Sequence, residues 1–143
     1  MIGNILFSTP NCGLIIIYTF IHIMDKRTVV LGASDNPERY SYKAVITLTK
    51  EGYTAIPIGN KKGTINGIVI LNDRPILTDI NTVTLYLAPE RQADYYDYIL
   101  NLKPKRVIFN PGTENRAFEQ LLIKYGIEAI EACTLVMLAV KNY

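Results

Sequence analysis

The sequence is poor in the side chains that most often carry catalysis and metal binding. Its 143 residues include one histidine, His22, two cysteines, Cys12 and Cys133, and no tryptophan. The cysteines lie far apart, which argues against a zinc site or a disulfide framework and favours a reducing, cytoplasmic setting. Because His22 lies in an atypical N-terminal segment, the rest of the chain cannot assemble a Ser–His or Cys–His pair. We assign no catalytic residue and no metal ligand.

The sequence also lacks an excess of charge of one sign. A net charge of +2 is too small to indicate nucleic acid binding, and the basic residues form no long run. With 49% hydrophobic and 20% charged residues, the composition excludes disordered and fibrous chains. The length predicts one globular domain with a single core.

No hydrophobic run is long enough to span a membrane. The apolar run at residues 14–23 is shorter than the roughly 20 residues that cross a bilayer, and no lysine or arginine precedes it as in a signal peptide. Met24 then resembles a natural chain start. We expect residues 1–23 to be a non-native or non-essential extension, residues 24–143 to form the domain, and no membrane partner. A membrane-associating or signal segment and a genuine extra element are the alternatives.

From residue 28 onward, predicted strands alternate with predicted helices. Apolar runs predict strands at 28–31, 54–58, 82–87, 106–109 and 127–130, and a short edge strand near 68–71. Helical spacing predicts helices at 40–52, 89–103 and 133–140, and one capped by Thr113 that buries Tyr125 and stops at Gly126. Strands separated by helices pair in parallel with right-handed crossovers. The pattern predicts a doubly wound α/β sheet with helices on both faces.

A glycine turn follows the first predicted strand. A buried strand that breaks at Gly32 lets the backbone approach a ligand, and the next helix directs its N-terminal N–H groups toward it, as in phosphate sites. In doubly wound sheets, ligands lie above the carboxyl ends of the strands, where the strand order reverses. The segments expected to converge there are residues 32–36, 59–62, 88–89, 110–113 and 131–133.

The residues after the second long strand bear on the identity of the ligand. An NAD site favours G-x-G-x-x-G in the first turn and an acidic residue after strand two, whereas this chain has the single Gly32 and then Lys61 and Lys62. Lysines suit a phosphate on the adenosine ribose, which coenzyme A carries at the 3′ carbon and NADP at the 2′ carbon. Both ligands remain open, as does the alternative that the lysines are solvated loop charges.

Other candidate residues also allow two interpretations. Ser34 suits either a pyrophosphate contact or a ligand-free turn, and Arg39 opposes the dipole of the next helix unless an anion lies there. Cys133 suits either a contact with the thiol end of coenzyme A, including a mixed disulfide, or packing as a small apolar side chain. One of the tyrosines could stack on adenine, or all of them could pack as ordinary core or half-exposed residues; the candidates are Tyr40, Tyr42, Tyr95, Tyr96 and Tyr98.

Several of these segments together resemble a known family. The resemblance covers residues 27–140 and rests on Gly32-Ala33-Ser34-x-Asn36-Pro37-x-Arg39, Ile56-Pro57-Ile58-Gly59-Asn60-Lys61, Ala88-Pro89, Asn110-Pro111-Gly112 and Cys133. The chain resembles the CoA-binding protein family, small Rossmann-like proteins similar to the CoA-binding domain of the succinyl-CoA synthetase alpha subunit. The resemblance implies a five-stranded, mainly parallel sheet that holds coenzyme A without a settled reaction.

We therefore expect a domain that binds coenzyme A or acyl-CoA as a non-catalytic carrier, sensor or regulatory module. The alternatives are an NADP-type oxidoreductase and a ligand-free interaction subunit on the same fold. A protein partner, including a second copy of the chain, is left open. The expected cofactor-binding residues are Gly32, Ala33, Ser34, Asn36, Arg39, Pro57, Gly59, Asn60, Lys61, Lys62, Pro89, Asn110 and Cys133.

Overall fold

The computed structural model describes residues 25–143, so the expectations for residues 1–23, Cys12 and His22 lie outside it. Its main sheet has five parallel strands in the order β2 (Ala55–Ile58), β1 (Thr28–Leu31), β5 (Thr82–Leu85), β6 (Arg106–Phe109) and β7 (Glu128–Glu131). The helices are α2 (Tyr40–Lys50), α3 (Pro89–Gln92), α4 (Tyr96–Leu102), α5 (Arg116–Lys124) and α6 (Thr134–Ala139). The predicted five-stranded, Rossmann-like fold is confirmed.

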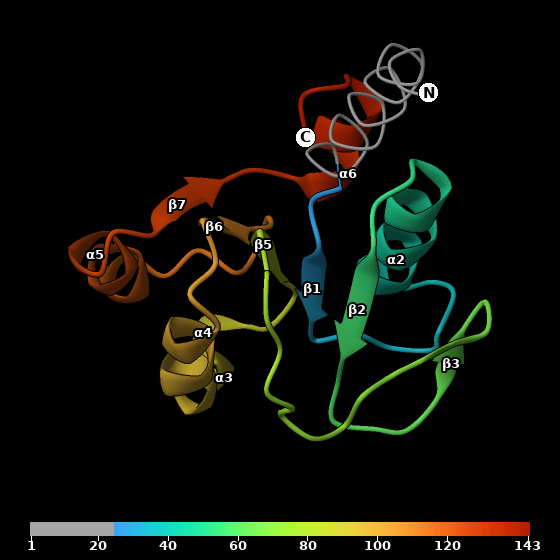
Figure 1. Ribbon diagram of the computed structural model, residues 1–143, viewed down its shortest axis with the longest axis horizontal. Helices are drawn as coiled ribbons and strands as arrows, with labels where there is room; N and C mark the ends of the chain where they lie inside the picture. Colours follow the sequence, from blue (N-terminus) through green and yellow to red (C-terminus); the bar gives the residue numbers. More distant parts are fainter. Residues whose placement is uncertain (1–24) are drawn as a thin grey trace, which may run out of the picture.

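The helices cover both faces of the sheet, because alternate residues of each strand point to opposite faces. Val29 of β1 packs in an apolar cluster with side chains of α4 and α5, among them Phe118. Val30, the next residue, packs in a second cluster with side chains of α2 and α6, among them Leu48. Figure 1 shows α2 and α6 on one side of the sheet and α4 and α5 on the other.

The strand order reverses between β1 and β5. From β1 the chain passes through α2 to β2 on one side of β1, and then returns to β5 on its other side (Figure 1). Connections from a central pair of strands that leave in opposite directions open a crevice above their carboxyl ends. The fold therefore places Gly32, after β1, beside Tyr86, after β5.

The segment between β2 and β5 differs from the prediction. The expected edge strand at 68–71 is shorter, β4 (Ile68–Val69), and it pairs with β3 (Thr64–Ile65) in a separate antiparallel hairpin. Asn66 and Gly67 form its turn with φ of 49° and 84°. An Asn-Gly pair is a strong hairpin signal that our prediction passed over, since it favours turns with positive φ at both central residues.

The helix predicted at 89–103 is interrupted. It consists of α3, a 3-10 turn η1 (Ala93–Tyr95), and α4, which ends at Lys103 in a left-handed conformation with φ of 50°. Gln92, fully buried at the end of α3, donates to the backbone oxygens of Leu87 at 2.9 Å and Thr113 at 2.7 Å. This anchor holds α3 against the strand ends, while α4 packs along the sheet.

The cap predicted for the helix before Gly126 is also wrong. Helix α5 begins after Asn115, whose side-chain oxygen accepts a hydrogen bond from the N–H of Phe118 at 3.2 Å. Thr113 instead donates its hydroxyl to the backbone oxygen of Asn110 at 2.8 Å. Tyr125, expected on the buried face, lies after the end of α5 and is 62% exposed. None of the helices formed by residues 25–143 is long and apolar enough to cross a membrane.

Candidate functional site

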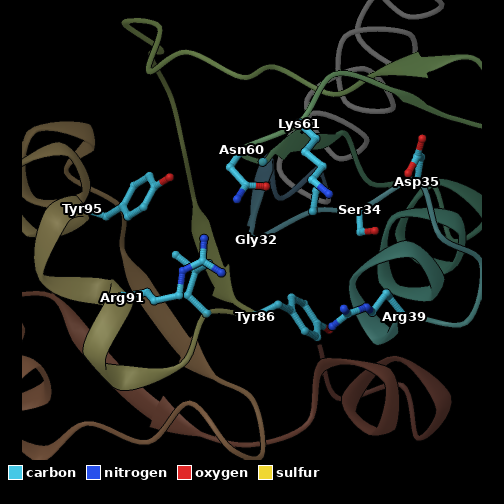
Figure 2. A pocket seen from close by; sticks show the side chains of 12 residues that line it. Gly32, Ser34, Asp35, Arg39, Asn60, Lys61, Tyr86, Arg91 and Tyr95 are labelled. Carbon is cyan, nitrogen blue, oxygen red and sulfur yellow. The ribbon is translucent and has the colours of Figure 1, made fainter.

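A pocket of about 280 Å³ lies at the crevice between the ends of β1 and β5. Its walls come from the turn after β1, the segment after β2, the end of β5 and the α3–η1 region, so segments far apart in sequence meet there (Figure 2). A switch point of a parallel sheet is the usual place for a ligand in this class of fold. We refer to this cavity as the switch-point pocket.

Glycines allow the strand ends to approach one another. Gly32 has a φ of 93°, and a Cβ atom there would lie 2.9 Å from the backbone carbonyl of Tyr86. A Cβ atom at Gly59 would lie 2.3 Å from the backbone oxygen of Ala33. The N–H groups of Gly32 and Ala33 both donate to the backbone oxygen of Ile58 at 2.9 Å. This part of the pocket wall is therefore closely packed main chain, and no side chain at Gly32 or Gly59 occupies the space beside it.

Cationic side chains from separate segments are directed into the switch-point pocket. Lys61 comes from the segment after β2, Arg91 from α3, and Arg39 from the residue that precedes α2 (Figure 2). Asp35 also lines the pocket, but its carboxylate points away from the centre in Figure 2. This arrangement of charge favours an anionic ligand.

Helix α2 adds to this preference for an anion. Its first turn holds no acidic residue, and Arg39 at its N-cap forms no side-chain capping hydrogen bond. The first N–H groups of a helix lack partners within the helix and carry a partial positive charge. The start of α2, at Arg39, Tyr40 and Ser41, lines a second cavity of about 260 Å³ that also includes Gly32 and Ser34. This position therefore favours an anionic group such as a phosphate.

An apolar pocket continues from there toward the start of α6. It has a volume of about 250 Å³, and none of its lining side chains carries a charge. The lining residues are Tyr40, Tyr86, Asn110, Pro111, Cys133 and Leu135. Tyr86 also lines the other two cavities, so the three cavities adjoin around its side chain, and we refer to them together as the path. One end of this path is cationic, and the other end is apolar.

The Tyr86 hydroxyl is buried within this path. Among the residues that the structure describes, its oxygen makes no hydrogen bond of standard geometry, although the hydroxyls of Thr84 and Thr134 lie near it. Burial raises the pKa of Tyr86 to about 12. The phenol is therefore neutral at physiological pH, and Tyr86 presents an uncharged ring to both the switch-point pocket and the apolar pocket.

The Asn110 side chain supports the apolar pocket from below. Its Nδ2 donates to Thr84 Oγ1 at 2.6 Å and to the backbone oxygen of Leu85 at 2.9 Å, and its Oδ1 accepts from the N–H of Thr134 at 2.8 Å. Asn110 is 3% exposed. Since the amide donates to Thr84 and Leu85 of β5 and accepts from Thr134 at the start of α6, it holds these two elements together beside the apolar pocket.

The structure brings most of the predicted site residues together. Seven of the thirteen line the switch-point pocket, namely Gly32, Ala33, Ser34, Arg39, Gly59, Asn60 and Lys61. Asn110 and Cys133 line the apolar pocket. Cys133 is the N-cap of α6, so the helix begins one residue after the start that we expected.

The remaining predicted residues lie outside these pockets. Asn36 accepts a hydrogen bond from the N–H of Glu38 at 2.9 Å, which stabilises the turn before α2. Pro57 lies within β2 beside Val30. Pro89 occupies the first turn of α3, and Lys62 is exposed next to Lys61. The roles of all thirteen residues in binding stay predictions. Lys61 lines the switch-point pocket and Lys62 does not, so the geometry favours Lys61 as the residue that contacts a ligand.

Sequence reasoning missed several residues that line the switch-point pocket. They are Tyr86, Leu87 and Arg91, together with Tyr95, which we had named only as one of five tyrosines; Asp35, which also lines the pocket, lies in the expected segment 32–36. A signal for two of them was present, because Arg91 and Tyr95 are four residues apart just after the strand-end pair Ala88-Pro89. That spacing places both side chains on one side of a helical segment. Residues 25–143 hold no cluster of three metal-ligating side chains.

Comparisons with known proteins agree with this architecture. A crystal structure described as an uncharacterized protein is 49% identical, has a TM-score of 0.82, and the match covers 83% of this chain and 98% of that chain. The cell-free ID.343 protein from Thermus thermophilus is 21% identical with a TM-score of 0.73, over 88% of this chain and 96% of that chain. A search of curated proteins found no match.

A larger protein shares the fold over part of its length. The dinucleotide-forming acetyl-coenzyme A synthetase 1 of Candidatus Korarchaeum cryptofilum, solved with phosphate and ADP, is 13% identical with a TM-score of 0.61. The match covers 77% of this chain and 26% of that one. The model of a family described as "CoA binding domain" matches residues 26–139, which include every element of the main sheet. The chain therefore belongs to the CoA-binding domain family.

Proposed function

We propose that this protein binds coenzyme A or acyl-CoA at the switch-point pocket and acts as a non-catalytic carrier, sensor or regulatory module in the cytoplasm. The observation that carries the proposal is the convergence of Arg39, Lys61 and Arg91, from separate segments, on the glycine turn at Gly32. Membership of the CoA-binding domain family supports the choice of ligand.

The pyrophosphate of coenzyme A suits the turn after β1 and the start of α2. Ser34 and Arg39 line both the switch-point pocket and the cavity at the helix start. The Ser34 hydroxyl accepts from the N–H of Asn36 at 3.1 Å, and its own proton remains available for a phosphate oxygen. Charge-assisted hydrogen bonds of this kind are among the strong ones in protein sites.

Lys61 suits the 3′-phosphate on the adenosine ribose. It follows β2, where an NAD-binding fold carries an acidic residue for the ribose hydroxyls, and its amino group is directed toward the glycine turn (Figure 2). A lysine there stabilises a phosphate monoester and disfavours an unphosphorylated ribose.

The pantetheine arm suits the apolar pocket. A path leads from the cationic cavities past Tyr86 to Leu135 and Cys133, which matches a ligand with a charged nucleotide at one end and a thiol arm at the other. The non-catalytic role rests on chemistry: residues 25–143 contain no histidine, and Cys133 is their one cysteine. No base lines the apolar pocket beside that thiol.

Native mass spectrometry tests this proposal. The protein is mixed with equal amounts of coenzyme A and NADP, and the intact mass of the complex is recorded. We expect the adduct to carry coenzyme A. A preferred NADP adduct would support the oxidoreductase alternative. A protein that binds neither coenzyme A nor NADP would support a ligand-free interaction subunit. Both outcomes contradict the proposal.

A further inference from the structure

We propose that Tyr95 is the platform on which the adenine base stacks, and that Arg74 holds the Tyr95 ring in position for it. This inference rests on the proposed function and names the part of the pocket that recognises the base. Tyr95 would be a binding residue and Arg74 a positioning residue.

The interruption of the helix after β5 places Tyr95 in the switch-point pocket. Buried Gln92 ends α3, and the 3-10 turn η1 carries Tyr95 as its last residue before α4. Its half-buried side chain lines the same pocket as Lys61 and Arg91, and its hydroxyl points into the pocket in Figure 2. Tyr95 also packs against the apolar cluster of α4 and α5, so only the part of its ring that lines the pocket is available to a ligand.

The other candidate tyrosines are engaged elsewhere. The Tyr96 ring stacks on Phe118 with centroids 4.0 Å apart, and its hydroxyl accepts from Asn115 at 2.8 Å. Tyr98 donates its hydroxyl to the backbone oxygen of Pro75 at 2.8 Å. Tyr42 packs in the cluster between α2 and the sheet.

Tyr40 lies outside the switch-point pocket, where Lys61 and the proposed 3′-phosphate site lie. It lines the cavity at the start of α2 and the apolar pocket, but not the switch-point pocket. Lys43 lies over its ring, 5.3 Å from the centroid. Of the five tyrosines, Tyr95 alone shares a pocket with Lys61.

Arg74 fixes the Tyr95 ring from outside the pocket. Its guanidinium carbon lies 4.0 Å from the ring centroid, and one of its nitrogens donates to the backbone oxygen of Asp94 at 2.5 Å. Arg74 does not line the switch-point pocket, so its contact with the ring lies outside that pocket. A ring held this way loses little freedom on binding, which favours stacking on its other face.

The covalent structure of coenzyme A explains why this position suits adenine. The base and the 3′-phosphate are attached to the same ribose, so the groups that bind them must lie within one pocket. Lys61 and Tyr95 meet this condition, because both line the switch-point pocket and come from different segments of its wall (Figure 2). Aromatic side chains bind bases of any identity by stacking. Tyr95 therefore increases the affinity for any ligand that carries adenosine, whether or not its ribose carries a 3′-phosphate.

Calorimetry with ligand fragments tests the platform. The ligands are coenzyme A, dephospho-CoA, which keeps adenine and lacks the 3′-phosphate, and 4′-phosphopantetheine, which lacks the adenosine. We expect Tyr95→Ala to weaken the first two by the same factor, about 5- to 150-fold, and to leave 4′-phosphopantetheine unchanged. Tyr95→Phe should keep wild-type affinity, and Arg74→Met should show the Tyr95→Ala pattern with a smaller factor.

Tyr125→Ala is the matched control, since it truncates an exposed tyrosine that lies after α5 and lines none of the three cavities; it should bind all three ligands as the wild type does. If the wild type does not bind coenzyme A, the proposed function fails. If the wild type binds coenzyme A and Tyr95→Ala binds it equally well, the platform alone fails. Equal weakening of all three ligands by Tyr95→Ala would also overturn the platform, because it would indicate a general distortion of the site.

Discussion

A Cβ atom added to Gly32 would lie 2.9 Å from the backbone carbonyl of Tyr86. The backbones of Gly32 and Tyr86 therefore approach each other closely at the ends of β1 and β5, where the strand order reverses. Side chains do not approach backbone this closely without movement of one or the other. Gly32 is therefore required by its neighbour as well as by its φ of 93°.

Gly32→Ala should lower the free energy of unfolding by about 2–4 kcal/mol, because a left-handed conformation and a steric overlap both oppose the methyl group. Gly52→Ala is the control, since Gly52 has the same φ of 93° and nothing within 4 Å of the added atom. It should lose only about 1–2 kcal/mol. Urea denaturation measures both values, and equal losses would show that the Tyr86 contact contributes nothing.

Lys61→Ala should erase the preference of the protein for coenzyme A over dephospho-CoA. We expect that preference to be about 10- to 150-fold in the wild type, since a hydrogen bond to a charged group contributes about 1.5–3 kcal/mol. Lys62→Ala is the matched control, because Lys62 does not line the pocket, and it should keep the preference. Calorimetry with both ligands decides this, and a preference that survives in Lys61→Ala would contradict the assignment.

Asn110→Ala should lower the free energy of unfolding by about 2–4 kcal/mol. The substitution removes the hydrogen bonds from Nδ2 to Thr84 and Leu85 and leaves the buried N–H of Thr134 without its acceptor. Asn101→Ala, at an exposed position of α4, should change stability by less than about 0.5 kcal/mol. A loss of ligand affinity in Asn110→Ala without a loss of stability would show that the side chain contacts the ligand instead.

Tyr86 should make the fold sensitive to alkaline pH. Below about pH 10 its phenol is protonated in the folded and unfolded chains alike, so it has no effect on the pH dependence of stability. Above pH 10 the unfolded chain releases the proton, whereas burial holds the pKa of folded Tyr86 at about 12. The unfolded chain then binds fewer protons, and the free energy of unfolding falls between pH 10 and pH 12, by about 2–3 kcal/mol for this residue.

Urea denaturation of the wild type and Tyr86→Phe at about pH 9 and about pH 11 measures this effect. The variant should lose less stability over this range, because phenylalanine has no proton to release. Identical alkaline losses in the two proteins would contradict the role of Tyr86.

A chain that begins at Met24 should fold and melt within a few degrees of the full chain. It retains all strands of the main sheet and the whole region matched by the family, residues 26–139. Loss of an apolar run at the terminus should also improve solubility. Differential scanning calorimetry of both chains tests the expectation, and a large drop in melting temperature would make residues 1–23 a structural element.

Local signals in the sequence were sufficient for the architecture. Apolar runs of strand length, separated by helical segments, determine a parallel sheet, since no other pairing joins such strands through right-handed crossovers. The break at Gly32 and the basic Lys61 determine where an anionic ligand is expected, because both follow strand ends that must meet at one edge. These inferences depend on chain order and residue type alone.

Tertiary contacts decided the rest. Lys61 and Lys62 are equivalent in the sequence, and the path of the chain after β2 places only Lys61 in the pocket wall. The sequence predicts that Asn110 contacts the ligand. In the structure its side-chain amide forms hydrogen bonds with Thr84, Leu85 and Thr134, which come from other segments. Tyr95 was one tyrosine among five in the sequence, whereas in the structure it ends the 3-10 turn and lines the pocket, with Arg74 over its ring. Periodicity and residue type report which face of an element is buried, whereas the partner of a polar or aromatic side chain depends on which distant segments pack beside it.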